Sequence, residues 1–427
     1  MINIKNVPEI RFKGCYDKDG NWVAFTHPWE QRKLGDIVER VVRKNTNNES
    51  SLPLTISAQY GLVDQITYFN NRVASRDVSN YYLVLNGEFA YNKSTSDGFP
   101  FGAVKRLDLY EKGVLSTLYI VFSIKNQSEI DSDYLTVFFD TDRWHKGVSE
   151  RAAEGARNHG LLNISADDFF DIDIFLPVHK EEQVVIGSYL RHLDNLITLH
   201  QRKADTYKKL KKCMLQKMFP KDGEIVPERR FPKFTEPWKK HKFGDVVHIR
   251  RGLTYRPTDV EENGIRVLRS SNINENTFVY GNDDIFVNPN AVNIETVREN
   301  DILITSANGS SRLIGKHTLI KEIPDNSAVH GGFMLLGRTE NYDFVNASMN
   351  SSWYTKFINV FVAGGNGAIG NLNKNDLGGQ VILFPNDDEQ IKVGKYFSTL
   401  DNLINITQQK VDIYKKLKKC MLQKMFV

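Results

Sequence analysis

Residues 207–219 read Tyr-Lys-Lys-Leu-Lys-Lys-Cys-Met-Leu-Gln-Lys-Met-Phe, and residues 414–426 repeat the run without a change. The match continues upstream at the same offset, so that Glu182-Gln183 pairs with Glu389-Gln390. Over about forty residues, roughly two positions in three are identical, and a repeat period near half the chain length indicates two copies of one unit.

Both copies of the repeat have the apolar spacing of a long helix. No proline interrupts either copy, and a helix of about 35 residues is roughly 50 Å long. An apolar stripe of that length needs a partner, and the simplest partner is the other copy, packed as a coiled coil. The apolar positions are Ile186, Leu190, Leu193, Ile197, Ala204, Tyr207, Leu210 and Met214, and then Val393, Phe397, Leu400, Ile404, Val411, Tyr414, Leu417 and Met421.

A shorter repeat opens each half of the chain. Pro28-Trp29, followed by Leu34-Gly35-Asp36, corresponds to Pro237-Trp238, followed by Phe243-Gly244-Asp245. The bodies that follow have diverged and read as short β-rich runs between clusters of Gly, Asn, Ser and Asp. We therefore predict an α+β chain of two β-rich domains with pseudo-two-fold symmetry, separated by two long α-helices packed as an antiparallel coiled-coil spacer.

A chain of 427 residues exceeds the usual size of one hydrophobic core, so several domains are expected. The predicted parts are an N-terminal segment (1–27), a first body (28–178), a central repeat helix (179–220), a linker (221–234), a second body (235–386) and a C-terminal repeat helix (387–427).

The composition is that of an ordinary globular protein, with 41% hydrophobic and 25% charged residues and a formal net charge of +4. Cys15, Cys213 and Cys420 form neither a zinc-ligand spacing nor a disulfide framework, which suits a reducing compartment. The sequence contains no apolar stretch of transmembrane length and no apolar signal core. We expect a cytoplasmic protein without a membrane anchor or a metal site.

Several catalytic signatures are absent from the sequence. No two prolines are adjacent, which excludes the usual loop of amino-methyltransferases, and no Glu-x-Lys occurs, which excludes the common metal-dependent nuclease motif. Gly365–Gly370 fits the GxGxxG pattern, but the residues that follow leave no room for a crossover helix. We interpret this segment as a glycine-rich loop and predict no catalytic residue.

Polar loops that follow predicted strands carry side chains suited to binding a ligand. Arginine suits bidentate contact with guanine, Asn suits adenine, and Ser, Thr and Lys suit phosphates. An ordinary solvated turn is the alternative for any single loop. The candidate DNA-binding residues are Tyr91, Asn92, Lys93, Ser94, Arg157, Arg250, Arg251, Thr254, Arg256, Arg269, Ser271, Asn272, Ser306, Asn308, Ser310, Arg312 and Lys316.

The lysines of the repeated run form a second candidate surface. A solvated face near a helix C-terminus, where cations interact well with the dipole, explains the charges alone. It does not explain identical runs beside diverged bodies, for which two identical partners docking on equivalent surfaces are the better account. The candidate partner-binding residues are Lys208, Lys209, Lys212, Lys415, Lys416 and Lys419.

The order of these fragments resembles the DNA-specificity subunit of type I restriction-modification enzymes. Closing segments carry the resemblance further: Leu176-Pro177 precedes Glu182-Gln183, and Phe384-Pro385 precedes Glu389-Gln390. The resemblance implies that each body is a target-recognition domain that reads one half of a bipartite, asymmetric double-stranded DNA site. It also implies two methyltransferase subunits docked on the helices, two restriction motor-nuclease subunits, and no active site in this chain. S-adenosylmethionine, magnesium and ATP would then bind to the partners.

A different class of protein stays open. A coiled-coil scaffold that carries two protein- or sugar-binding β domains would show the same periodicity and the same repeat. An enzyme with an unrecognised site has no support, since none of the ten histidines has a spacing that indicates a nucleophile or a metal pair.

Overall fold

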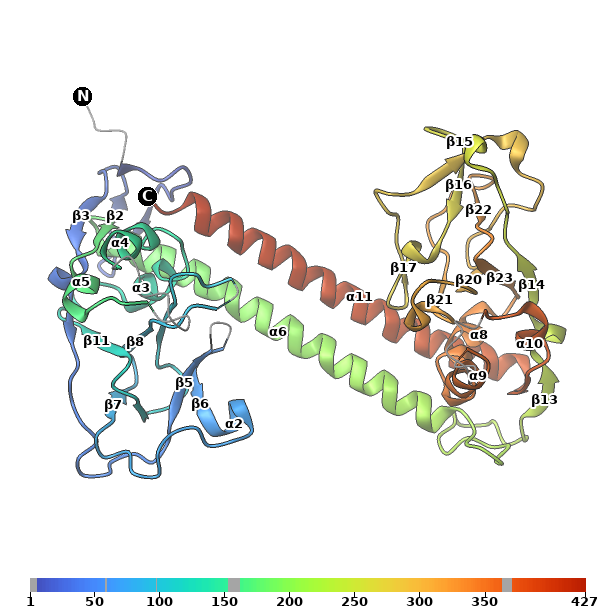
Figure 1. Ribbon diagram of the computed structural model, residues 1–427, viewed down its shortest axis with the longest axis horizontal. Helices are drawn as coiled ribbons and strands as arrows, with labels where there is room; N and C mark the ends of the chain where they lie inside the picture. The colour runs from blue at the N-terminus through green and yellow to red at the C-terminus, as the bar shows by residue number, and fades with distance from the viewer. Residues whose placement is uncertain (1–5, 58–59, 97, 153–161, 363–370) are drawn as a thin grey trace. The chain divides into compact units, whose positions relative to one another are not determined.

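A computed structural model describes residues 6–57, 60–96, 98–152, 162–362 and 371–427. The chain divides into unit 1, formed by Met1–His200 and Gln409–Val427, and unit 2, formed by Gln201–Gln408. The long helices α6 (Lys180–Met218) and α11 (Asp387–Lys424) each contribute one part to each unit (Figure 1). No helix in the described ranges is long and apolar enough to cross a membrane.

Unit 1 is built around an antiparallel sheet in the order β4-β11-β8-β9. These strands are β4 (Val38–Arg40), β11 (Ile120–Ile124), β8 (Phe89–Asn92) and β9 (Ala103–Arg106). Four two-stranded pairs surround the sheet: β1 (Gly14–Tyr16) with β2 (Trp22–Ala24), β3 (Glu30–Lys33) with β12 (Asp173–Leu176), β5 (Leu54–Ser57) with β6 (Gly61–Asp64), and β7 (Tyr82–Leu85) with β10 (Lys112–Leu115). The shorter helices are α1 (Leu34–Ile37), α2 (Gln65–Phe69), α3 (Ser132–Phe138), α4 (His145–Arg151) and α5 (Ala166–Phe170).

Unit 2 has an equivalent antiparallel sheet in the order β14-β23-β20-β21. Its strands are β14 (His248–Arg251), β23 (Met334–Arg338), β20 (Ile302–Thr305) and β21 (His317–Leu319). A second sheet contains β15 (Val260–Glu261), β19 (Ile285–Val287), β16 (Ile265–Leu268) and β22 (Ala328–His330), and β16 pairs with β22 in parallel. The two-stranded pairs are β13 (Lys239–Lys242) with β24 (Val381–Phe384), and β17 (Ile273–Asn274) with β18 (Thr277–Phe278).

Short helices and 3-10 turns complete unit 2. The α-helices are α7 (Phe243–Val246), α8 (Tyr342–Met349), α9 (Ser352–Val362) and α10 (Lys374–Gly378). The short 3-10 turns are η3 (Pro257–Asp259), η4 (Ser270–Asn272), η5 (Pro289–Ala291) and η6 (Ser311–Leu313). In each unit the strand that follows the opening repeat lies at the sheet edge, so the bodies share a central sheet although their sequences differ. The predicted α+β class is confirmed.

A buried carboxylate anchors the start of each long helix. Arg11 donates from Nε and Nη2 to the two carboxylate oxygens of Glu182 at 2.6 and 2.7 Å. Arg230 does the same to Glu389 at 2.7 Å for both bonds. Both glutamates are fully buried, and such bidentate, charge-assisted pairs combine strength with a fixed geometry. The repeated Arg and Glu therefore tie the segment before each body to the helix after it.

A repeated glycine lets a second helix begin against each long helix. A Cβ atom added at Gly187 would lie 2.6 Å from the backbone nitrogen of Tyr134, at the start of α3. At Gly394 the corresponding distance is 2.7 Å, to the backbone nitrogen of Phe344 in α8. Because real Cβ atoms do not approach backbone this closely, these two positions need glycine for space.

Within each unit, part of α6 packs antiparallel to part of α11. In unit 1, Lys418 Nζ contacts both carboxylate oxygens of Asp194 at 2.8 Å, and the rings of His200 and Tyr414 stack at 5.7 Å. The partner of a later residue of α6 is thus an earlier residue of α11, so the two helical segments run antiparallel. The equivalent pair in unit 2 joins Lys211 to Asp401 at 2.5 Å. The repeated aspartate and one repeated lysine are thus partners inside the protein.

The last residue of each repeated run completes a hydrophobic core. Phe426 lies in the core of unit 1, with ring centroids 6.1 Å from Trp29 and 5.6 Å from Tyr134. Phe219 lies in the core of unit 2, 5.8 Å from Trp238. The apolar end of the run therefore has a structural role in both units.

Gly187→Ala should destabilise unit 1. Alanine favours a helix by about 1 kcal/mol over glycine, but a clash with backbone costs about 1–3 kcal/mol, so the net change is a loss. Urea unfolding followed by tryptophan fluorescence measures it. Ser188→Ala, on the exposed side of the same helical turn, is the matched control. A Gly187→Ala chain as stable as the native one would show that no tight approach exists here.

Lys418→Met should destabilise unit 1 by about 2 kcal/mol, because it leaves two partly buried carboxylates without this cation. The ammonium contacts Asp140 at 2.9 Å as well as Asp194. Lys416→Met, two residues away on an exposed position, should leave the unfolding midpoint unchanged. Equal effects of the two substitutions in urea titrations would contradict the assignment.

Acid should weaken the same ion-pair cluster. Burial alone would raise the pKa of Asp140, but the charges of Lys105 and Lys418 outweigh burial and hold the pKa below its usual value. A carboxyl with a lowered folded-state pKa contributes stability above its unfolded pKa of about 3.9 and loses that stability as pH falls. The stability difference between the native chain and Lys418→Met should therefore shrink from about pH 6 to about pH 3. A difference that stays constant over that range would argue against this electrostatic account.

Candidate nucleic-acid interface

Loops at the ends of several strands of unit 2 meet on one surface. Asn308, after β20, donates from Nδ2 to Ser270 Oγ, after β16, at 2.8 Å. The backbone nitrogen of Ser306 donates to the carbonyl of Phe333, just before β23, at 2.9 Å. These bonds join loops that are far apart in the sequence, and we call the surface they form the strand-end surface.

The loop after β14 joins the strand-end surface from the other side. The backbone nitrogen of Leu253 donates to the carbonyl of His330 at 2.7 Å, and Gly331 donates to the carbonyl of Leu268 at 2.9 Å. The loop that begins at Arg251 is therefore held beside the ends of β16 and β22.

Six of the predicted DNA-binding residues of unit 2 are exposed to solvent, and Lys316 is one of those that are half-buried. In the part of the chain that the structure describes, none of these seven side chains takes part in an ion pair, so their charges and hydroxyls are available to a ligand. The six exposed residues are Arg251, Thr254, Arg256, Ser271, Ser310 and Arg312.

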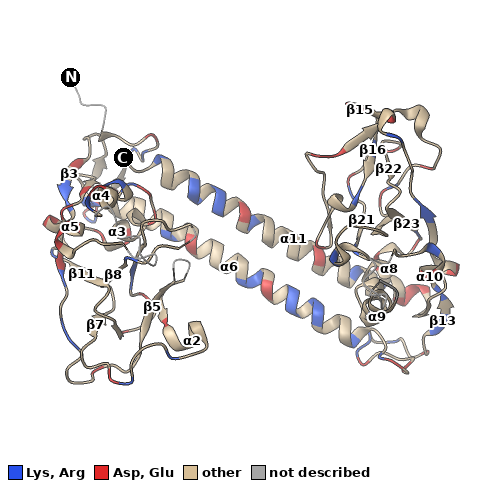
Figure 2. Cartoon of the chain, viewed as in Figure 1, with Lys and Arg blue, Asp and Glu red and all other residues tan. Residues whose placement is uncertain are grey.

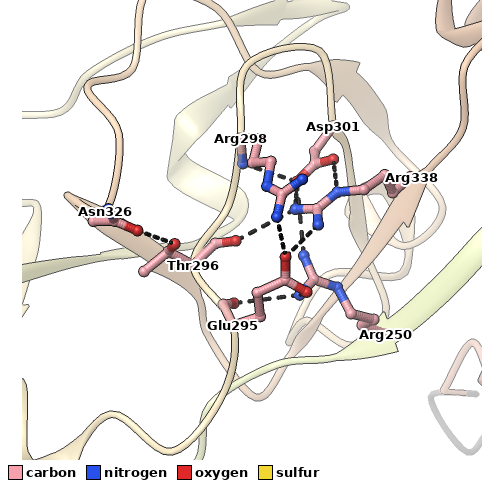
Figure 3. Close-up of polar contacts among 7 residues, drawn as sticks. All are labelled: Arg250, Glu295, Thr296, Arg298, Asp301, Asn326 and Arg338. Atoms are coloured by element: carbon pink, nitrogen blue, oxygen red, sulfur yellow. Dashed lines mark hydrogen bonds and ion pairs between the residues drawn. The ribbon is translucent and has the colours of Figure 1, made fainter.

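Arg250 belongs to an ion-pair network instead (Figure 3). Its Nη1 donates to Glu295 Oε2 at 2.6 Å, and its Nη2 lies 3.7 Å from Asp301. Arg338 binds both oxygens of buried Asp301 at 2.7 Å, and Arg298 contacts Glu295 at 2.9 Å. The hydrogen bond from Arg338 helps to lower the pKa of Glu295, and burial lowers the pKa of Arg250. The guanidinium of Arg250 is thus fixed by the protein.

Other predicted residues of unit 2 serve the loops that carry them. Asn272 is fully buried, accepts from the backbone of Arg269 at 2.8 Å and donates to Asp284 at 2.8 Å. Arg269 contacts Asp283 Oδ2 at 2.9 Å. Ser306 is buried, and its carbonyl accepts from the backbone of Leu372 at 2.8 Å. Asn272 and Ser306 leave little surface for a base or a phosphate, and their role is to shape the strand-end surface.

In unit 1 the predicted loop after β8 is partly structural. The ring of Tyr91 is fully buried and stacks on Phe169 at 4.4 Å, and its hydroxyl donates to the carbonyl of Phe101 at 2.8 Å. Tyr91 is therefore a core residue that DNA does not reach, a placement that its position among polar residues did not indicate.

The residues after Tyr91 are more open. Asn92 accepts from the backbone of Ser94 at 3.0 Å, Lys93 donates to the carbonyl of Ile164 at 3.3 Å, and Ser94 is exposed. Arg157 and the glycine-rich segment 365–370 lie outside the described residues.

The sequence did not point to three residues near the strand-end surface. Phe333 is 74% exposed, although it lies directly before the buried strand β23. Lys374 and Asn375, at the start of α10, line a cavity of about 540 Å³ together with Arg250 and Arg251. Lys374 and Asn375 are more than 100 positions from the two arginines in sequence, so only the folded chain brings these four residues together.

The lysines of the repeated run divide into two sets. Lys211 and Lys418 form the internal ion pairs, whereas all six predicted partner-binding lysines are exposed. Figure 2 shows the basic positions as blue bands on α6 and α11. Each exposed set lies on a single helix: Lys208, Lys209 and Lys212 on α6, and Lys415, Lys416 and Lys419 on α11.

Exposed apolar side chains also recur at equivalent positions of the helices. Val184 and Leu199 of α6 correspond to Ile391 and Ile406 of α11, and all four are exposed. These side chains are scattered singly along the helices, as is normal for apolar residues on a protein surface.

Known proteins share the sequence pattern and the fold of this chain. Residues 235–413 match the family model described as the type I restriction modification DNA specificity domain. Two proteins of Methanocaldococcus jannaschii are each 23% identical to this chain. The type I restriction enzyme MjaVIII specificity subunit matches over 94% of this chain and 93% of its own length. The putative type I restriction enzyme MjaX specificity subunit matches over 92% of this chain and 91% of its own length. The crystal structure of a type I restriction-modification S subunit from M. genitalium has a TM-score of 0.62 at 14% identity, with 99% of each chain covered. The chain is thus similar to type I specificity subunits along nearly its whole length.

Replacing Arg250 should lower the stability of the protein, whereas replacing Arg312 should weaken its DNA binding. Arg250→Gln removes a cation from the Glu295 and Asp301 network and should cost about 1–3 kcal/mol of stability. Arg312→Gln changes an exposed side chain and should leave the urea midpoint unchanged while weakening DNA binding in fluorescence anisotropy. If Arg312→Gln binds DNA as the native chain does, Arg312 lies outside the interface.

Proposed function

We propose that this chain is the non-catalytic specificity subunit of a type I restriction-modification complex, and that each β-rich domain reads one half of a bipartite, asymmetric DNA site. The observation that carries the proposal is the match of residues 235–413 to the DNA specificity domain. Within that stretch, exposed Arg, Ser and Thr side chains that have no ion-pair partner among the described residues lie on loops that follow strands.

The chemistry of that surface suits the readout of DNA. Arginine offers a rigid pair of donors to guanine, and hydroxyls bind base edges or phosphates. Arg251 and Arg312 are presented on loops whose shape is fixed by internal hydrogen bonds, and a fixed shape lowers the entropy lost on binding. The exposed ring of Phe333 can make apolar contact with a thymine methyl group.

Scaffolding is the second part of the proposal. The exposed lysine set on α6 and its copy on α11 offer the same surface twice, as two identical methyltransferase subunits require. Two restriction motor-nuclease subunits complete the complex. S-adenosylmethionine, magnesium and ATP bind to those partners, and this chain supplies recognition.

Fluorescence anisotropy with the purified chain, alone and with a type I methyltransferase subunit, tests the function. The methylated motif is first obtained by mapping methylated adenines in cells with and without the gene. We expect weak binding by the chain alone, and selective binding of duplexes that contain the motif once the partner is added. Methylation or cleavage by the chain alone would contradict the proposal. Binding to glycans or peptides without binding to DNA would favour a scaffold with two other binding domains.

Charge reversal in the repeated runs should break assembly without unfolding the protein. Lys208→Glu with Lys209→Glu, and Lys415→Glu with Lys416→Glu, change exposed side chains only. Each pair should reduce co-purification with the methyltransferase subunit, because a like charge replaces an attractive one at the interface.

The matched control is Lys239→Glu with Lys240→Glu, two exposed lysines of β13 outside the repeat. It should co-purify normally, and all variants should keep the native urea midpoint. Undiminished co-purification of both repeat variants would show that these lysines are only a solvated face.

A further inference from the structure

We infer that the cavity beside β14 in unit 2 is a seat for one phosphate group of the DNA backbone, held by Arg251, Lys374 and His330. This inference rests on the proposed function and adds to it a contact that positions the DNA without reading its sequence. We call this cavity the phosphate seat.

The phosphate seat is built from four separate segments of unit 2. Its volume is about 540 Å³, and its lining includes Arg250 and Arg251 of β14, Glu295, His330 of β22, and Lys374 and Asn375 of α10. Hydrogen-bond donors outnumber acceptors on this wall, since Glu295 is its single carboxylate. Such a set of donors fits an oxyanion.

The charge around the phosphate seat is positive. Behind it, the three guanidinium groups of Arg250, Arg298 and Arg338 face the two carboxylates of Glu295 and Asp301, which leaves one positive charge. Two further cations line the phosphate seat itself: exposed Arg251 and half-buried Lys374. Neither has an ion-pair partner among the described residues. An anion entering there meets cations that no internal carboxylate has neutralised.

A buried donor at the phosphate seat lacks a partner. Arg250 Nε is buried and makes no hydrogen bond within the described ranges, and the buried Nη2 has only the 3.7 Å ion-pair contact with Asp301. The ring of His330 lies against the backbone of Arg250 and Arg251. His330 is 1% exposed, and burial, with the nearby charge of Arg250, lowers its pKa to about 4. The ring is therefore neutral at pH 7 and carries one N–H donor. Buried donors without partners are costly, and a phosphate oxygen would satisfy them.

Position favours a DNA phosphate over a carboxylate of a protein partner. Arg251 ends β14 and begins the loop that carries exposed Thr254 and Arg256, and Leu253 in that loop is bonded to the carbonyl of His330. The phosphate seat is therefore continuous with the strand-end surface. A duplex on that surface would bring backbone phosphates beside the groups that read its bases, and arginine and lysine are the usual ligands of those phosphates.

Salt-dependent binding tests the phosphate seat. Arg251→Gln and Lys374→Gln remove charge, and Arg251→Lys and Lys374→Arg keep it. The full-length variants are assembled with the methyltransferase subunit and titrated with motif and scrambled duplexes. Each charge-removing change should weaken binding to both duplexes alike, by about tenfold, and reduce the slope of log K against log salt by about 0.9. The charge-keeping variants should retain most of the affinity and the slope.

Single methylphosphonate substitutions along the motif duplex identify the contacted phosphate. One neutral linkage should weaken binding by the native complex but not by the Arg251→Gln, Lys374→Gln double variant. Unchanged affinity of the double variant, or a loss confined to one base pair of the motif, would overturn the inference. So would a loss of methyltransferase co-purification with intact DNA binding, which would assign the cavity to a carboxylate of that partner. A native complex that does not distinguish motif from scrambled duplex would instead contradict the proposed function itself.

Discussion

The ion pairs Lys418–Asp194 in unit 1 and Lys211–Asp401 in unit 2 set the register in which the long helices pack within each unit. A partly buried ion pair contributes little net stability, but a mismatched one is costly, so such a pair is suited to specify a register. That register brings Phe426 into the core of unit 1 and Phe219 into the core of unit 2. Each unit therefore needs the end of a long helix to complete its core, and for unit 1 that end lies far from the body in the sequence.

The repeated residues and the diverged residues have separate tasks. Glu182, Gly187 and their copies attach the long helices to the bodies, through buried ion pairs and close backbone contacts. The loops of the strand-end surface take no part in that attachment, so they can change without loss of the frame. This separation suits a protein whose recognition varies while its assembly stays constant.

The sequence predicted the α+β class and the two long helices because periodicity and repetition are local patterns. The sequence could not show that adjacent Arg250 and Arg251 have different roles. The carboxylates that hold Arg250 come from residues 295 and 301, and no residue close to the arginines in sequence indicates this contact. Tyr91 was misleading for the same reason, because the core that encloses it includes Phe169. The phosphate seat depends on Lys374, whose neighbours are known only from the fold.

The most direct test of the central claim, that each β-rich domain reads its own half-site on a constant helical frame, is a map of methylated adenines for a hybrid chain. Residues 235–386 are replaced by the equivalent domain of another type I specificity subunit, and the hybrid is expressed with the methyltransferase subunit. We predict that one half of the bipartite motif changes, while the other half and the gap between them stay the same. An unchanged motif, or a simultaneous change in both halves, would contradict it.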